Sequence, residues 1–210
     1  MKLSQVFGST LVVSALISTQ ALAARELTPM PSVSEYFSQE DDAAPRGNWS
    51  APDTVVPVLV DGIVYSPDAF RTLNGAGVRH FVLDENAAQQ GVMLGFRTKQ
   101  ALADYFRSQG RMPSDDSAML CNNYSYWYED WKYLGRYISA QAGYGYNNLD
   151  TISWGNRISS VIPTTCGRYA ILWEAPNYAG ASLFLGAGYP AEYLATYGWN
   201  DRARSVGSWQ

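Results

Sequence analysis

The only histidine of the 210-residue chain, His80, stands where a carboxylate could orient it as a catalytic base. In the stretch RHFVLDE, which reads as a strand, His80 and Asp84 fall on the same face because strand side chains alternate with a period of two. A histidine and a carboxylate placed in this way could act as general base and orienting group. No Ser or Cys stands in a nucleophile motif, and one histidine cannot build a histidine-rich metal centre. The sequence therefore favours a packed strand histidine in a protein that is not an enzyme.

A second set of polar residues occurs in two similar loops, at 154–160 (WGNRISS) and 199–205 (WNDRARS). The loops belong to an internal repeat, because residues 121–165 align with residues 166–210 without a gap and with about 14 identities. Two copies indicate a closed pair, since a solenoid needs three or more repeats to bury its faces. Four short antiparallel strands in each copy would form a Greek key, and two keys would form an all-β sandwich.

Both copies share an ordered pair of motifs. An aromatic residue, Glu and then Tyr-x-Gly occur in YEDWKYLG and in WEAPNYAG, and each is followed by a polar loop, GNRISSV or NDRARSV. In this order the motifs resemble those of the βγ-crystallin double Greek key. The resemblance covers residues 121–210, under half of the chain. Microbial secreted members of that superfamily include calcium-binding modules, inhibitors of metallopeptidases and killer-toxin-like proteins.

The resemblance implies calcium at the polar loops, where each ion is held by the acid or amide end of one loop and the hydroxyl of the other. Calcium prefers six to eight hard oxygen ligands. Asn200 and Asp201 of the second copy, combined with Ser159 of the first, form an intact set. Backbone oxygens near Glu129 and Glu174 could complete a site. One weak calcium site is therefore expected.

The other crossed combination is defective. Gly155 stands where the resemblance expects Asn or Asp, so Asn156 alone remains at that end of the loop. Arg204 replaces the expected hydroxyl, which removes an oxygen and adds a permanent cation. We expect no calcium at this second site. The plainer alternative for both loops is that they are turns, in which the serines bond the backbone.

The first 54 residues read as export and linker sequence. Residues 1–23 have one lysine, an uncharged run and a small-residue end, which is typical of a secretory signal peptide. Residues 24–54 are rich in Pro, Ser and acidic residues and predict a flexible arm. Asn48 and Asn123 fit the N-glycosylation pattern. No later stretch has the roughly 18 apolar residues of a membrane span, so a secreted, extracellular protein is expected.

The cysteine content indicates the redox compartment of the protein, and the net charge excludes some classes of partner. Cys121 and Cys166 occupy equivalent repeat positions, and export to an oxidising compartment favours a disulfide between them. Such a bridge would contribute roughly 3–4 kcal/mol in the chain-entropy model. The net charge of −4 and the pI of about 4.9 come without a basic stripe, which argues against nucleic acid and anionic membranes.

Residues 55–112 predict a small α+β domain ahead of the all-β domain at 118–210. Asp61-Gly62 between two apolar runs is a hairpin signal. Helices are expected after the capping residues Ser66 and Thr98, with strands RHFVLDE and VMLGFRT between them. The expected order is ββαββα.

Three functions are compatible with these features. The first is a secreted, monomeric, non-enzymatic binding or structural protein with one weak calcium site, whose partner is an unknown protein or cell-surface ligand. The second is a peptidase inhibitor, presenting the loop at 141–150 or at 163–168 to a protease. The third is an antimicrobial or effector-like toxin that uses exposed Tyr and Trp as contact area.

Overall fold

The computed structural model describes most of the chain between residues 27 and 209. The described residues are 27–39, 50–110, 112, 124–165 and 168–209. Several predicted features lie outside them, namely the signal peptide at 1–23, Cys121 and Cys166, and the sequons at Asn48 and Asn123. The disulfide, the glycosylation sites and secretion therefore stay predictions.

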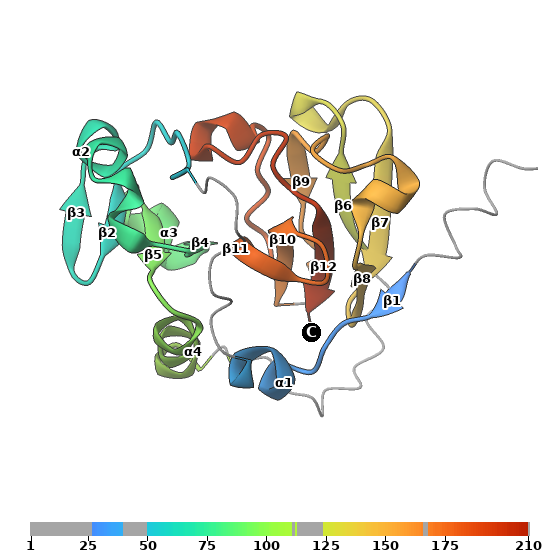
Figure 1. The fold of residues 1–210 in the computed structure, drawn as a ribbon, viewed down its shortest axis with the longest axis horizontal. Helices are drawn as coiled ribbons and strands as arrows, with labels where there is room; N and C mark the ends of the chain where they lie inside the picture. Colours follow the sequence, from blue (N-terminus) through green and yellow to red (C-terminus); the bar gives the residue numbers. More distant parts are fainter. Residues whose placement is uncertain (1–26, 40–49, 111, 113–123, 166–167, 210) are drawn as a thin grey trace, which may run out of the picture.

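The repeat folds into strands of two facing sheets (Figure 1). The first copy supplies β6 (Tyr124–Tyr128), β7 (Tyr137–Gln141), β8 (Tyr144–Tyr146) and β9 (Ser160–Ile162). The second copy supplies β10 (Tyr169–Ala175), β11 (Ala179–Gly186) and β12 (Ser205–Trp209). One sheet has the order β7-β6-β9, and the other contains the run β8-β12-β10-β11.

Each copy gives its third segment to the sheet of the other copy. β8 of the first copy pairs with β12, with Tyr146 opposite Val206. At the equivalent position of the second copy, Ala191 bridges Val161 of β9. This exchange ties the two Greek keys into one sandwich, so the predicted fold class is confirmed for this half of the chain.

The repeat is also visible in the turns. Lys132 and Tyr133 have φ values of 52° and 63°, and the equivalent Asn177 and Tyr178 have 61° and 59°. One serine fixes each of these turns. Ser160 donates to the Asp130 carbonyl at 2.6 Å and accepts from the Tyr133 amide at 3.0 Å. Its repeat equivalent, Ser205, makes the matching pair of bonds at 2.7 and 3.1 Å.

Residues 55–110 form alternating strands and helices. They are β2 (Val58–Val60), β3 (Ile63–Tyr65), α2 (Pro67–Thr72), the 3-10 turn η2 (Asn74–Gly77), β4 (His80–Leu83), α3 (Glu85–Gln90), β5 (Met93–Phe96) and α4 (Lys99–Ser108). The predicted caps are present, since Ser66 and Thr98 each accept a hydrogen bond from a backbone amide of the helix that follows. The order differs from ββαββα by α3, which was not predicted.

Helix α3 changes the role of Asp84. The strand ends at Leu83, and the Asp84 side chain caps α3 by accepting from the Ala87 amide at 3.1 Å. Gly91 ends the helix with a φ of 65°. A helix of six residues has too few positions to show a 3.6-residue period, which is why the sequence pattern did not indicate α3.

The predicted boundary at 112–118 does not divide the sheets. β4 pairs in parallel with β11, with Phe81 opposite Leu183. The resulting nine-stranded sheet has the order β1-β8-β12-β10-β11-β4-β5-β2-β3 and runs through both predicted domains (Figure 1). The α+β elements thus extend the sandwich sheet instead of packing beside it.

Part of the predicted flexible arm is ordered against this sheet. β1 (Thr28–Pro29) adds to the edge strand β8, and α1 (Val33–Ser38) follows it. Met30 lies against Gly145 and Gly207, where a Cβ on Gly207 would stand 2.0 Å from the Met30 sulfur. The arm lacked a sequence pattern because its ordered elements are only two and six residues long.

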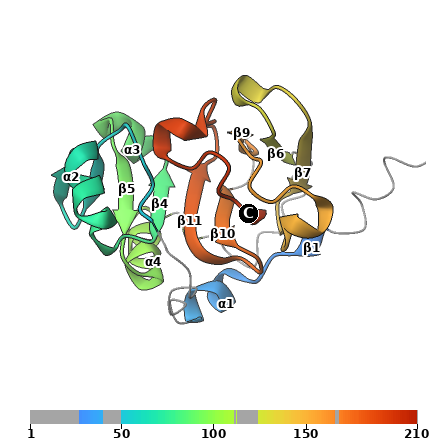
Figure 2. The ribbon, with the colours of Figure 1, turned by 45° about the horizontal axis from the view of Figure 1, so that its top comes forward.

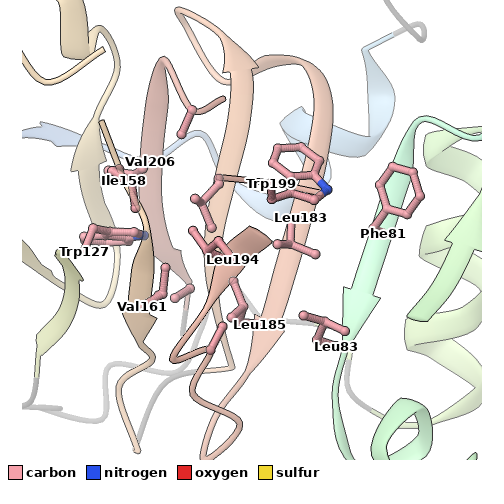
Figure 3. Packing of buried hydrophobic residues seen from close by; sticks show 14 of the residues in the cluster. Phe81, Leu83, Trp127, Ile158, Val161, Leu183, Leu185, Leu194, Trp199 and Val206 are labelled. Atoms are coloured by element: carbon pink, nitrogen blue, oxygen red, sulfur yellow. The ribbon is translucent and has the colours of Figure 1, made fainter. Parts of the chain in front are cut away.

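Two hydrophobic clusters use opposite faces of the large sheet. The first fills the sandwich and includes Trp127, Val161, Leu183 and Trp199, with Phe81 of β4 at its side (Figure 3). The second lies on the outer face, where residues of α1 and α4 pack on Trp173, Phe184 and Trp209. Figure 2 shows α1 and α4 beside this sheet. Three short 3-10 helices, η3 (Trp131–Tyr133), η4 (Leu149–Ile152) and η5 (Leu194–Tyr197), complete the turns. Of the helices in the described ranges, none has the length and apolar character to cross a membrane.

Candidate metal-binding loops

The two polar loops run beside each other at one end of the sandwich, held by reciprocal backbone bonds. The Asp201 amide donates to the Ile158 carbonyl at 3.0 Å, and the Asn156 amide donates to the Ala203 carbonyl at 2.8 Å. Asn156 and Asp201 are repeat equivalents and have φ values of 55° and 54°. The fold therefore crosses the loops, with the acid end of each loop near the hydroxyl end of the other.

The structure brings together Ser159, Asn200 and Asp201, the predicted intact set. The Ser159 hydroxyl hydrogen-bonds the Asp201 carboxylate, and Asn200 Nδ2 donates to Asp201 Oδ2 at 2.7 Å. Burial raises the pKa of the Asp201 carboxyl, although the hydrogen bond from Ser159 and the charge of Arg157 act in the opposite direction. A carboxylate, an amide and a hydroxyl thus converge at one point on the surface.

Asp130 is a further acidic residue at this site that the motif did not include. Its charge is close enough to raise the pKa of Asp201. Asp130 follows Glu129 in the turn after β6, and the Ser160 hydroxyl fixes that turn by bonding the Asp130 carbonyl. Only its position next to Glu129 could have suggested it from the sequence.

Glu129 and Glu174 use their side chains in ion pairs. Arg136 binds both oxygens of Glu129, at 2.8 and 2.9 Å, and Arg157 reaches Oε1 at 3.1 Å. The hydrogen bond from Arg136 lowers the pKa of the Glu129 carboxyl. Arg202, the repeat equivalent of Arg157, binds Glu174 Oε1 in the same way. The carboxylates of both residues are already paired, so backbone oxygens near Glu129 and Glu174 stay the predicted contribution to a metal.

The second crossed site is filled by an ion pair within the chain. Arg204 Nε donates to Asp150 Oδ2 at 2.9 Å, and a second guanidinium nitrogen contacts the same oxygen. The Asp150 carboxylate covers Gly155, because a Cβ there would stand 1.9 Å from Asp150 Oδ1. Asn156, the remaining predicted ligand, is exposed. This site holds a guanidinium where the intact site has a serine hydroxyl.

The donor chemistry therefore fits calcium at one site and not at the other. Ser159, Asn200 and Asp201 offer hard oxygens of three kinds, with Asp130 nearby. Within the described ranges, no three His, Cys, Asp or Glu side chains are grouped as a metal cluster. A site of this type would consequently depend on amide, hydroxyl and backbone oxygens besides its carboxylates.

His80 is packed within the large sheet. It is 2% exposed, and its Nδ1 lies 2.8 Å from the hydroxyl of Ser182 on the neighbouring strand β11. Ser182 is fully buried, and Asp84 belongs to the cap of α3. Asp84 keeps extended backbone angles, caps α3 and accepts from the Tyr105 hydroxyl at 2.7 Å, so its carboxylate already has structural partners.

The proposed inhibitory loops are only partly loops. Within 141–150, Tyr144–Tyr146 form strand β8, and Gly145 and Tyr146 are buried. Of 163–168, Pro163 and Thr164 are buried, and residues 166 and 167 lie outside the described part of the chain. The middle of the first segment, Tyr144–Tyr146, is therefore an inner strand between β1 and β12.

Comparison with solved structures gives similarity for part of the chain. A βγ-crystallin domain from Flavobacterium johnsoniae is 30% identical, covering 41% of this chain and 93% of that one, with a TM-score of 0.34. A βγ-crystallin domain from Clostridium beijerinckii is 21% identical, covering 41% and 98%, with a TM-score of 0.35. A βγ-crystallin from Ciona intestinalis is 17% identical, covering 41% and 99%, with a TM-score of 0.35.

No protein-family profile and no curated protein sequence matches the chain. The similarity to solved structures extends over well under half of it. The strand exchange and the paired turns of the repeat are those of a double Greek key. The resemblance predicted from the repeated motifs is thus confirmed: this part of the chain is similar to βγ-crystallin domains.

Proposed function

We propose that the protein is a secreted, non-enzymatic binding or structural protein whose double Greek key takes one calcium ion. The ion would bind between Ser159 of the first copy and Asn200 and Asp201 of the second. The observation that supports this proposal is the contact of Ser159 with the Asp201 carboxylate across the two copies. Calcium would link the two loops through charge and oxygen ligation, and affinity near 10⁻⁴–10⁻³ M is expected for an extracellular module.

The repeat supplies a matched pair of variants for testing this site. Asp201 and Asn156 occupy equivalent positions with nearly equal φ values, but only Asp201 belongs to the intact set. Calorimetric titration of the full chain with calcium should show one site. Asp201→Ala should abolish the binding, and Asn156→Ala should leave it within about twofold of the original. Two equal sites, no heat at millimolar calcium, or loss of binding in Asn156→Ala would refute the proposal.

The contrast between the sites can also be tested by repair. In the double variant Gly155→Asn with Arg204→Ser, the second loop pair regains the expected amide and hydroxyl, and the guanidinium that pairs with Asp150 is removed. Released from Arg204, the Asp150 side chain can turn away from the Cβ added at position 155, which would otherwise lie 1.9 Å from its Oδ1. A second calcium site should appear in the titration. If the double variant still binds one ion, the Arg204–Asp150 pair is not what disables the second site.

The peptidase-inhibitor and toxin alternatives stay predictions. Of the segment 141–150, Tyr144–Tyr146 cannot serve the inhibitor alternative as a presented loop, because β8 is inserted between two other strands. Incubation with thermolysin-like and serine proteases separates it from the calcium-binding proposal. Inhibition at near-stoichiometric amounts would favour the inhibitor, and digestion of the intact chain would oppose it.

A further inference from the structure

The outer face of the three-stranded sheet carries a row of tyrosines. Tyr124, Tyr126 and Tyr128 alternate along β6 with the buried Ser125 and Trp127, so their rings project away from the core. The ring centroids of neighbours along the strand are 6.3 and 6.4 Å apart. The row along β6 is therefore continuous. We call Tyr124, Tyr126 and Tyr128, together with Tyr137 of β7, the tyrosine face.

Tyr137 of β7 widens the row into a surface. Its ring centroid lies 5.6 Å from that of Tyr126 and 5.5 Å from that of Tyr128. Tyr137 is 56% exposed and Tyr124 is 38% exposed. A shift of one residue in the strand register would have placed both side chains on the core face of the sheet instead. Contiguous exposed aromatic surface marks an interaction site more often than isolated apolar residues do. Figure 2 shows this sheet at the opposite end of the molecule from α2.

Among the described residues, no charged side chain is paired across the sheet with these tyrosines, which decides among ligand classes. Besides Tyr137, the residues paired across the sheet with the β6 tyrosines are Gln141, Ser139, Ile162 and Ser160. A stacking platform for single-stranded nucleic acid needs a positively charged groove along the backbone, and no charged residue lies among these cross-strand pairs. The net charge of the whole chain is −4. The ligand should therefore be neutral, with flat apolar faces and a polar rim.

We propose that the tyrosine face binds a neutral, extended polysaccharide. Pyranose rings have apolar C–H faces that pack on aromatic rings, and their equatorial hydroxyls can bond phenol and amide groups at the edge. Tyrosine combines a flat ring with a hydroxyl, and it does so at low cost in side-chain entropy. The open row along β6 suits successive sugars of a chain better than a single enclosed sugar. This binding is separate from the calcium site.

Sedimentation of the full chain with insoluble cellulose and with chitin tests the proposal. Depletion from the supernatant is expected on at least one of the two, and it should persist at 1 M salt because no charge is involved (Debye length about 3 Å). Tyr126→Ala and Tyr137→Ala should each bind at least about tenfold more weakly. Tyr137→Phe should bind nearly as well as the unmodified chain, because the ring is retained. Tyr144→Ala, on the other sheet and 45% exposed, is the matched control and should bind normally.

Four outcomes would overturn the proposal. They are no depletion on either polysaccharide, loss of binding at high salt, equal weakening by Tyr144→Ala, and equal weakening by Tyr137→Phe and Tyr137→Ala. Sedimentation velocity adds an independent test. If the chain dimerises and Tyr137→Ala makes it monomeric, the tyrosine face is an interface between copies instead.

Discussion

The two outer faces of the sandwich are both aromatic, yet only one of them is covered. On the large sheet, Trp173, Phe184 and Trp209 face outward and are buried under α1 and α4. On the small sheet, the corresponding outward residues are the tyrosines of β6 and β7, which keep contact with water. Trp and Phe need cover, whereas tyrosine keeps its hydroxyl solvated when its ring is exposed. The cover by α1 and α4 therefore separates a packing face, which also includes the buried Tyr169, from a contact face.

Tyr36 of α1 is the centre of the covered face, so its removal should have the largest effect. It is fully buried, its ring contacts Trp173, Phe184 and Trp209, and its hydroxyl accepts from Trp173 Nε1 at 3.2 Å. Tyr36→Ala should lower the free energy of unfolding by about 3–5 kcal/mol, as for other large aromatic truncations. Urea unfolding followed by tryptophan fluorescence measures this loss.

The control on the uncovered face is Tyr137→Ala. Because Tyr137 is more than half exposed, its truncation should cost no more than about 0.5 kcal/mol. Similar losses for the two variants would mean that the arm is not part of the folded core. The comparison of the two faces would then fail.

The arm also packs closely against glycines of the large sheet. A substitution there should lower the free energy of unfolding by a smaller amount than Tyr36→Ala. A Cβ on Gly207 would lie 2.0 Å from the Met30 sulfur, so Gly207→Ala should destabilise by about 1–3 kcal/mol through overpacking. Adding Met30→Ala should recover part of this loss, since it removes the clashing atom. Urea unfolding of both single variants and the double variant gives the coupling energy. Additive losses would show that Met30 does not occupy this position in solution.

The sequence predicted the sandwich well because the repeat places equivalent residues at equivalent turns. It did not predict how the rest of the chain joins it. The parallel pairing of β4 with β11 brings together residues about 100 positions apart, and no local pattern records such a register. The same limit applies to the candidate site. Ser159, Asn200 and Asp201 follow from the motif, whereas Asp130 and Asp150 lie outside it and reach the loops only through the folded turns.

The join between β4 and β11 contains a polar contact that can be tested. The Ser182 hydroxyl lies 2.8 Å from His80 Nδ1 in a buried environment. Ser182→Ala removes this partner of a buried histidine and should cost about 1–3 kcal/mol in thermal or urea unfolding. Ser125→Ala, which removes a buried serine pair with Ser208, provides a comparison away from the join. If Ser182→Ala leaves the free energy of unfolding unchanged, the contact does not help to hold the extended sheet together.

The smallest expected effect concerns the ionisation of Tyr128 on the uncovered face. Burial raises the pKa of its phenol, and the neighbouring phenols of Tyr126 and Tyr137 raise it further. The folded chain therefore retains this proton at a pH where the unfolded chain, with a pKa of about 10, has lost it. The resulting stabilisation is fully present below about pH 10 and is lost as the pH rises through the folded-state pKa. Tyr128→Phe should make urea stability less dependent on pH in this alkaline range, while Tyr144→Phe should not. If the free energy of unfolding of Tyr128→Phe changes with pH as steeply as that of the unmodified chain, the rings of the tyrosine face are more fully hydrated than their spacing indicates.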